Sequence, residues 1–246
     1  MADFDSVQLD KVVAVVDVEC LGLTPGSAVM EVGLVVGKLR EIMGFGLLKT
    51  NPIPDDLLVS NATVVSGCGL SFGPDCIETD ATGSSGYVSL YEFRFPNIGL
   101  QLVKGLRIEP ESLSWWQEPK QKPHFETMMA AKYDAGTMDE LLSVLKTADY
   151  LVCRGTDFDP PVLREFFKAF GKELPNGFWT WVDLRSVEST MKMLGLKVER
   201  EKNPNAHSAL ADAVNAARQY GQIMAKLVMP GLLLSLVPIT ATTDTK

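Results

Sequence analysis

The chain has 246 residues, of which 46% are apolar and 22% charged, so it can bury a sizeable core and is not wholly disordered. Its net charge of −8 and isoelectric point near 4.9 argue against a basic nucleic-acid coat protein, because neutralising phosphates requires Lys and Arg. A nuclease remains compatible with this charge, since carboxylates that bind metal ions are themselves negative. We expect neither a signal peptide nor a membrane span, and hence a cytoplasmic protein, in the host cytoplasm if the chain is viral.

The N-terminal part is rich in strand signals. Residues 11–18 are a β-branched apolar run without alternation, which indicates a central strand buried on both faces. Residues 28–36 predict a second strand, and 38–48 supply a further segment of undetermined kind. The stretch 66–86 is rich in Gly, Ser and Thr and predicts a loop or insertion, whereas 87–95 alternates as a strand.

The C-terminal part alternates between helix and strand. In chain order, the pattern predicts a short helix from 112 that ends at Pro119, a helix at 137–145, a strand at 150–153, a helix at 159–170, a strand at 178–182 and helices at 185–194 and about 208–227. Strands followed by this alternation indicate an α/β fold with a mixed sheet. We interpret 1–246 as one domain, with the insertion near 66–86 and an irregular tail from about 230.

Two carboxylates, Asp17 and Glu19, stand at the C-terminal end of the first predicted strand. Their spacing places both side chains on one face of that strand. They would repel each other, and hard divalent cations prefer oxygen ligands, so the pair favours Mg²⁺ or Mn²⁺ binding. By itself the pair is weak evidence, because a strand that ends in a polar turn has the same pattern.

A histidine and a third carboxylate, His207 and Asp212, lie near the start of the last predicted helix. Five residues rotate by roughly 140° along a regular helix, so both side chains cannot face one site from its middle. We therefore expect His207 in the loop or first turn, with its imidazole turned inward. Small residues such as Ala209 and Ala213 predict that the helix packs closely on the sheet, with Asp212 aimed at the strand-end carboxylates. The other histidine, His124, has no partner motif and is expected to be solvated.

In combination, Asp17-x-Glu19 and His207-x4-Asp212 are similar to the DEDDh branch of the DnaQ-like 3′-5′ exonucleases. The segment 153–163 resembles the middle motif of that family, a Phe-Asp pair that opens a helix after a short strand. This resemblance makes Asp159 the fourth carboxylate and leaves Asp157, its competitor, as a surface or helix-capping residue.

Two further segments resemble one group within this exonuclease family. Ser114-Trp115-Trp116-Gln117 and residues 181–186 look like the phage exonuclease A (DexA) and Rv2179c-type group. The resemblance spans about 13–217 and departs from the family at 154–156 and in the segment 66–86. It implies an RNase H-like fold, with a mixed sheet of about five strands flanked by helices.

The resemblance also implies a chemistry. Two divalent cations, Mg²⁺ or Mn²⁺, would be held by the four carboxylates, and His207 would act as the general base. The implied reaction is hydrolysis of the 3′-terminal phosphodiester of a nucleic acid, with release of nucleoside 5′-monophosphates. Single-stranded DNA is expected ahead of RNA as the substrate. The four metal-binding residues are Asp17, Glu19, Asp159 and Asp212.

Substrate contacts are less defined. Trp115 and Trp116 either stack on a base at the 3′ end or belong to the core. Asp183 and Arg185 either brace the site or contact phosphate, or form an internal ion pair. A 3′-5′ exoribonuclease and a catalytically silent nucleic-acid-binding module on the same fold remain alternative interpretations. The sequence neither supports nor excludes a protein partner or a homodimer.

Overall fold

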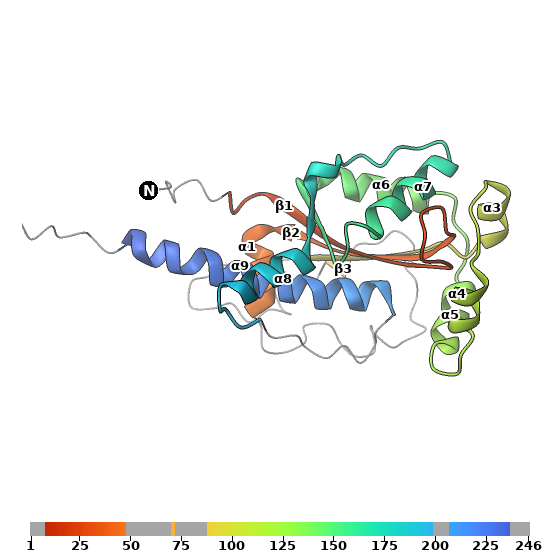
Figure 1. The fold of residues 1–246 in the computed structure, drawn as a ribbon. Helices are drawn as coiled ribbons and strands as arrows, with labels where there is room; N and C mark the ends of the chain where they lie inside the picture. Colours follow the sequence, from red (N-terminus) through yellow and green to blue (C-terminus); the bar gives the residue numbers. More distant parts are fainter. Residues whose placement is uncertain (1–7, 48–69, 72–87, 199–206, 237–246) are drawn as a thin grey trace, which may run out of the picture.

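A computed structural model describes residues 8–47, 70–71, 88–198 and 207–236 (Figure 1). Within these residues, six strands form one sheet in the order β3-β4-β2-β1-β5-β6. Their bounds are β1 Val12–Cys20, β2 Val29–Lys38, β3 Leu70–Ser71, β4 Ser89–Arg94, β5 Tyr150–Cys153 and β6 Trp181–Asp183. β1 pairs antiparallel with β2 and parallel with β5, so the sheet is mixed.

The sheet agrees with the predicted α/β architecture of about five strands flanked by helices, since β3 adds only two residues at one edge. The helices are α1 Leu39–Leu47, α3 Ile98–Val103, α4 Pro110–Trp116, α5 Lys122–Met129, α6 Thr137–Thr147, α7 Asp159–Ala169, α8 Leu184–Met193 and α9 Ala209–Leu236. The fold is RNase H-like.

Helices cover both faces of the sheet (Figure 1). α6 and α7 lie on one face, while α1, α8 and α9 lie on the other, and α4 and α5 stand at one end of the sheet. The alternation of side chains along β1 accounts for helices on both faces, because successive residues pack into the hydrophobic clusters on opposite sides of the sheet. Ala14 and Val16 pack with α6 and α7, and Val13 and Val15 pack with α1 and α9. The prediction of a strand buried on both faces is confirmed.

Helix α9 extends further than the sequence indicates. The pattern predicts a helix to about 227 and an irregular tail from about 230, but the helix passes Pro230 and ends at Leu236. A proline removes one backbone donor from a helix, and the leucines that follow Pro230 favour helical conformation. The predicted tail is therefore wrong as far as Leu236, and 237–246 lie outside the described residues.

The predicted strand at 178–182 is also corrected. Residues Phe178–Thr180 form a 3₁₀ turn, η3, and the strand begins at Trp181. Both the amide and the hydroxyl of Thr180 donate to the carbonyl of Gly177, at 3.1 and 2.7 Å, which closes the turn before pairing starts. β6 then pairs with β5 from Trp181 onward.

Three helices were not specified by the sequence pattern. The undetermined segment at 38–48 is α1, which packs against α9. α3 begins after Asn97, whose side chain accepts from the amide of Leu100, and α5 carries a proline in its first turn. The Gly/Ser-rich stretch 66–86 lies outside the described residues except for β3.

In the part of the chain that the structure describes, none of the helices combines the length and the apolar character needed to cross a membrane.

Candidate active site

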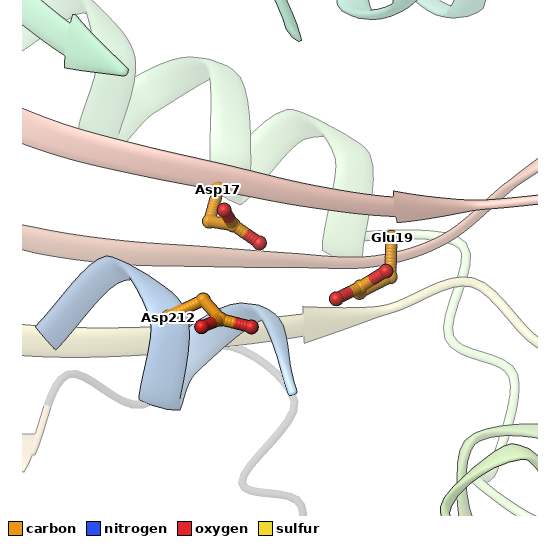
Figure 2. Close-up of side chains that lie close together, drawn as sticks. All are labelled: Asp17, Glu19 and Asp212. Atoms are coloured by element: carbon orange, nitrogen blue, oxygen red, sulfur yellow. The ribbon is translucent and has the colours of Figure 1, made fainter. Parts of the chain in front are cut away.

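Two carboxylates of β1 and one that is distant in sequence, on α9, converge at the C-terminal end of β1. Asp17 and Glu19 project from β1 toward α9, and Asp212 faces them from the first turns of α9 (Figure 2). One oxygen from each of the three lies within 4.8 Å of the others. The expected convergence of Asp17, Glu19 and Asp212 is thus present in the structure.

The pairing of β1 with β2 explains how α9 comes so close. Asp17 lies opposite Gly33, and Glu19 lies opposite Glu31. α9 starts directly over Gly33, because a Cβ on that residue would stand 2.2 Å from the backbone carbon of Ala209. Only a glycine admits a backbone at this distance. The helix that carries Asp212 therefore rests on the strand next to the one that carries the other two carboxylates.

Burial and mutual repulsion both disfavour ionisation of Asp17 and Glu19. Each of the three carboxylates keeps some exposure, yet burial raises the pKa of Asp17 and of Glu19 well above their ordinary values. The charges of the neighbouring carboxylates, Asp212 among them, raise both values further. A divalent cation would relieve this repulsion, and an oxygen-only donor set is the set that Mg²⁺ and Mn²⁺ prefer. The residues therefore fit such a cation.

Asp159 lies beside this cluster and is not one of the three converging residues. It opens α7, is 5% exposed, and receives a backbone hydrogen bond from Val18, the residue between Asp17 and Glu19. Burial is the main cause that raises its pKa to about 7, while the thiol of Cys153 and the charge of Arg185 act in the opposite direction. Asp159 thus faces the same end of β1 from the helix layer opposite to α9.

His207 lies in the turn before α9, as expected, with φ of 74°. Its backbone amide donates to Oδ2 of Asp212 at 2.7 Å, which holds the turn against the helix. The imidazole packs edge-on against Trp115, with ring centroids 4.7 Å apart. Burial is the main cause that lowers the pKa of His207, Lys120 and His124 act in the same direction, and Asp212 opposes them. The side chain is therefore a neutral proton acceptor near neutral pH.

A cleft of about 470 Å³ opens beside the carboxylates and is lined by Glu19 and His207. The two tryptophans of α4 differ in their roles there. Trp116 is 2% exposed and donates from Nε1 to the carbonyl of Cys20 at 3.1 Å, so it is a core residue that also forms part of the cleft wall. Trp115 is only partly buried and presents its ring to the cleft.

Arg185 is exposed at the start of α8, and its positive charge acts on Asp159. Its guanidinium lies over Gly155, where an added Cβ would stand 3.2 Å from Nη1. Asp183 is the helix cap of α8, since its side chain accepts from the amide of Arg185 at 3.0 Å and from the hydroxyl of Ser186 at 2.8 Å. Asp157 is exposed, in agreement with the interpretation of a surface residue.

Sequence reasoning missed a buried polar cluster behind the site. Glu31 is 0% exposed, and its carboxylate contacts Arg94 at 3.0 Å and His124 at 3.4 Å. Burial would raise the pKa of Glu31, but His124, Arg94 and the amide of Ala209 outweigh it and hold the pKa below its ordinary value. The expectation that His124 is solvated is wrong, because it is partly buried between Trp116 and this carboxylate. A lone glutamate in the apolar run 28–36 was the available signal.

Comparison with known proteins agrees with this architecture. The fold is that of the RNase H-like proteins, which carry several different functions. More narrowly, the model of a family described as the 3′-5′ exoribonuclease Rv2179c-like domain matches residues 79–224, more than half of the chain. The chain belongs to this family and is therefore a nuclease-type hydrolase with a nucleic-acid substrate. The match includes Asp159, His207 and Asp212, and it begins after β1. No curated protein matches the chain.

Proposed function

We propose that the chain is a metal-dependent 3′-5′ exonuclease of the DEDDh type, acting from one domain whose described strands share a single sheet. The observation that carries the proposal is the convergence of Asp17, Glu19 and Asp212 within 4.8 Å at the end of β1. The family match supplies the class of reaction independently, because it was obtained from a region that excludes two of these three residues.

Each carboxylate has a definite task in this proposal. Asp17, Glu19 and Asp212 would hold one divalent cation, while Asp17 and Asp159 would hold a second, with Asp159 reaching it directly or through water. Bound cations of this kind lower the pKa of the attacking water and stabilise charge on the leaving 3′ oxygen. The raised pKa of Asp17 and Glu19 means that cation binding competes with protons at these carboxyls.

His207 is the proposed general base. Its neutral imidazole can take a proton from the attacking water, and its position at the edge of the cleft leaves it accessible to solvent. The amide of the same residue is tied to Asp212, so the base and a metal-binding carboxylate move as one unit. Trp115 is placed to stack on a terminal base, and Arg185 to contact phosphate.

RNA is the substrate that the family description favours, and this favours the exoribonuclease among the alternatives weighed from the sequence. The sequence alone placed single-stranded DNA first. Distinguishing the two sugars requires a contact to the 2′-hydroxyl, and the cleft offers polar side chains for this, Glu111 and Ser112, beside Trp115. We therefore propose RNA as the preferred substrate.

The test is digestion of 5′-labelled single-stranded RNA and of DNA of the same sequence, with Mn²⁺, with Mg²⁺ and with EDTA. The proposal predicts a ladder that shortens from the 3′ end, release of nucleoside 5′-monophosphates, faster loss of RNA than of DNA, and no reaction in EDTA. Asp212→Asn should abolish cleavage while the protein stays folded. Undiminished cleavage in EDTA or by Asp212→Asn would refute the metal-dependent mechanism, and faster digestion of DNA would reverse the substrate assignment.

A further inference from the structure

Glu31 joins the start of α9 to the sheet. Its Oε2 accepts a hydrogen bond of 2.8 Å from the amide of Ala209, the first residue of α9. The first amides of a helix have no partner within the helix, so an acceptor fixed in the sheet both satisfies one of them and sets where the helix begins. Ala209 lies between His207 and Asp212 in the chain, so whatever fixes this amide also fixes the base and the carboxylate.

The carboxylate of Glu31 is itself held from two further directions. Its Oε1 accepts from Nε of Arg94 at 3.0 Å, and its Oε2 lies 3.4 Å from Nε2 of His124. Arg94 is 8% exposed and also pairs with Glu92, at 2.8 Å from Nη2. Arg94 compensates the buried charge of Glu31, and the contacts with Arg94, His124 and Ala209 restrain its side chain.

Gly33 allows close contact between β2 and the start of α9. It lies two residues from Glu31, so both face α9 from β2, directly opposite Asp17 and Glu19. A Cβ at Gly33 would stand 2.2 Å from the backbone of Ala209, so α9 lies so close to β2 that only a glycine fits at this position. The hydrogen bond from Ala209 to Glu31 keeps it from moving away.

From this arrangement we propose that Glu31 is a positioning residue: by accepting the Ala209 amide, it sets the first turn of α9 so that Asp212 and His207 stand over Asp17 and Glu19. The inference rests on the proposed function, since it concerns the same candidate site. The positioning role requires both the length and an acceptor oxygen of the Glu31 side chain. A role in charge balance alone would require only a negative charge near Arg94.

Three substitutions separate these requirements. Glu31→Gln keeps the length and one acceptor oxygen for the Ala209 amide, but its amide nitrogen replaces the oxygen that accepts from Arg94. Glu31→Asp keeps the charge but withdraws the carboxylate by one methylene, about 1.5 Å. Glu31→Ala removes both, and Arg94 then still has Glu92 as its partner. The matched control is Asn97→Ala, which deletes the side-chain cap of α3, where Asn97 accepts from the amide of Leu100 at 3.0 Å.

The experiment measures Mn²⁺ affinity by calorimetry, kcat and KM on RNA, and the melting temperature in EDTA. We expect Glu31→Asp and Glu31→Ala to lose about 10–100-fold in Mn²⁺ affinity and in kcat, the range found for residues that orient metal ligands, with KM unchanged. Glu31→Gln should keep Mn²⁺ affinity and kcat close to wild type, while its melting temperature falls because its amide nitrogen cannot accept from Arg94. Asn97→Ala should lower the melting temperature without changing affinity or kcat.

The outcomes are distinguishable. If Glu31→Asp and Glu31→Ala melt earlier but keep wild-type affinity and kcat, Glu31 has only a stabilising role and the inference is overturned. Loss in Glu31→Gln equal to that in Glu31→Ala would also overturn it, because charge would then be what matters. If Glu31→Ala does not fold, the Mn²⁺ affinity and kcat of Glu31→Asp and Glu31→Gln still test the inference, because only Glu31→Asp is expected to lose them. Absence of Mn²⁺ binding by the wild-type protein would refute the proposed function itself.

Discussion

At the scale of single residues, the site brings together groups that oppose folding when no cation is bound. Asp17, Glu19 and Asp212 place like charges within 4.8 Å, and burial raises the pKa of the first two. Such an arrangement is retained at functional sites because function needs it, at a cost in stability. Replacing one of these charges should therefore harm activity and spare the fold.

His207→Asn tests the general base with little disturbance of the backbone. Asparagine tolerates the positive φ of this position better than alanine does, and the amide that bonds Asp212 is retained. We expect kcat to fall by roughly 10²–10⁴-fold, as for loss of a general base, with Mn²⁺ affinity unchanged. Single-turnover cleavage together with calorimetry would measure both; a variant with wild-type kcat would remove His207 from this role.

Asp159 gives a pH dependence whose sign follows from its pKa. Folding raises this pKa from 3.8 to about 7, so the folded protein binds the proton more tightly than the unfolded chain does. The stabilising contribution of the protonated carboxyl is therefore lost as pH rises from about 4 to about 7. In EDTA, the wild-type melting temperature should fall across this range more steeply than that of Asp159→Asn. Parallel curves for the two proteins in thermal melts would contradict the assignment.

At the scale of elements, the contact between β2 and the first turn of α9 sets the geometry of the site. Gly33→Ala places a Cβ 2.2 Å from the backbone of Ala209, so the helix start must shift. Gly221→Ala is the matched control on the same helix, because its Cβ would stand 2.0 Å from the carbonyl oxygen of Ile42 in α1, away from the site. Both variants should lose stability, by about 1–3 kcal/mol as for overpacking.

The two glycine variants should differ in metal binding. Gly33→Ala should weaken Mn²⁺ affinity, because Asp212 moves with the helix start, whereas Gly221→Ala should leave it unchanged. Chemical unfolding and Mn²⁺ calorimetry on the two proteins make the comparison. Equal affinities would mean that the start of α9 adapts without moving Asp212.

The elements also show what sequence patterns can predict. Residue patterns located β1, α7 and the start of α9, and together with the resemblance to exonucleases they pointed to Asp17, Glu19 and Asp212, which the fold brings together. Glu31 had one local signal, a lone glutamate in an apolar run, but its contact with His124 joins residues from separate elements, so patterns along the chain did not predict that contact. The extension of α9 past Pro230 was missed for a related reason, because proline is read as a helix end from local preference alone.

At the scale of the whole molecule, the mixed sheet gathers the carboxylates from three layers. β1 supplies Asp17 and Glu19, α9 supplies Asp212 from one face, and α7 supplies Asp159 from the other. The net charge of −8 means that the protein as a whole does not attract phosphate, so substrate binding depends on local groups and on cations. The proposed exonuclease therefore needs divalent cations for both substrate binding and chemistry.

Titration of the folded wild-type protein with Mn²⁺ in a calorimeter, beside Asp17→Asn, tests this requirement most directly. We expect saturable binding by the wild-type protein, with protons released as the cation displaces them, and strongly weakened binding by Asp17→Asn. A wild-type protein that takes up no Mn²⁺, or a variant that binds it equally well, would rule out the proposed metal site.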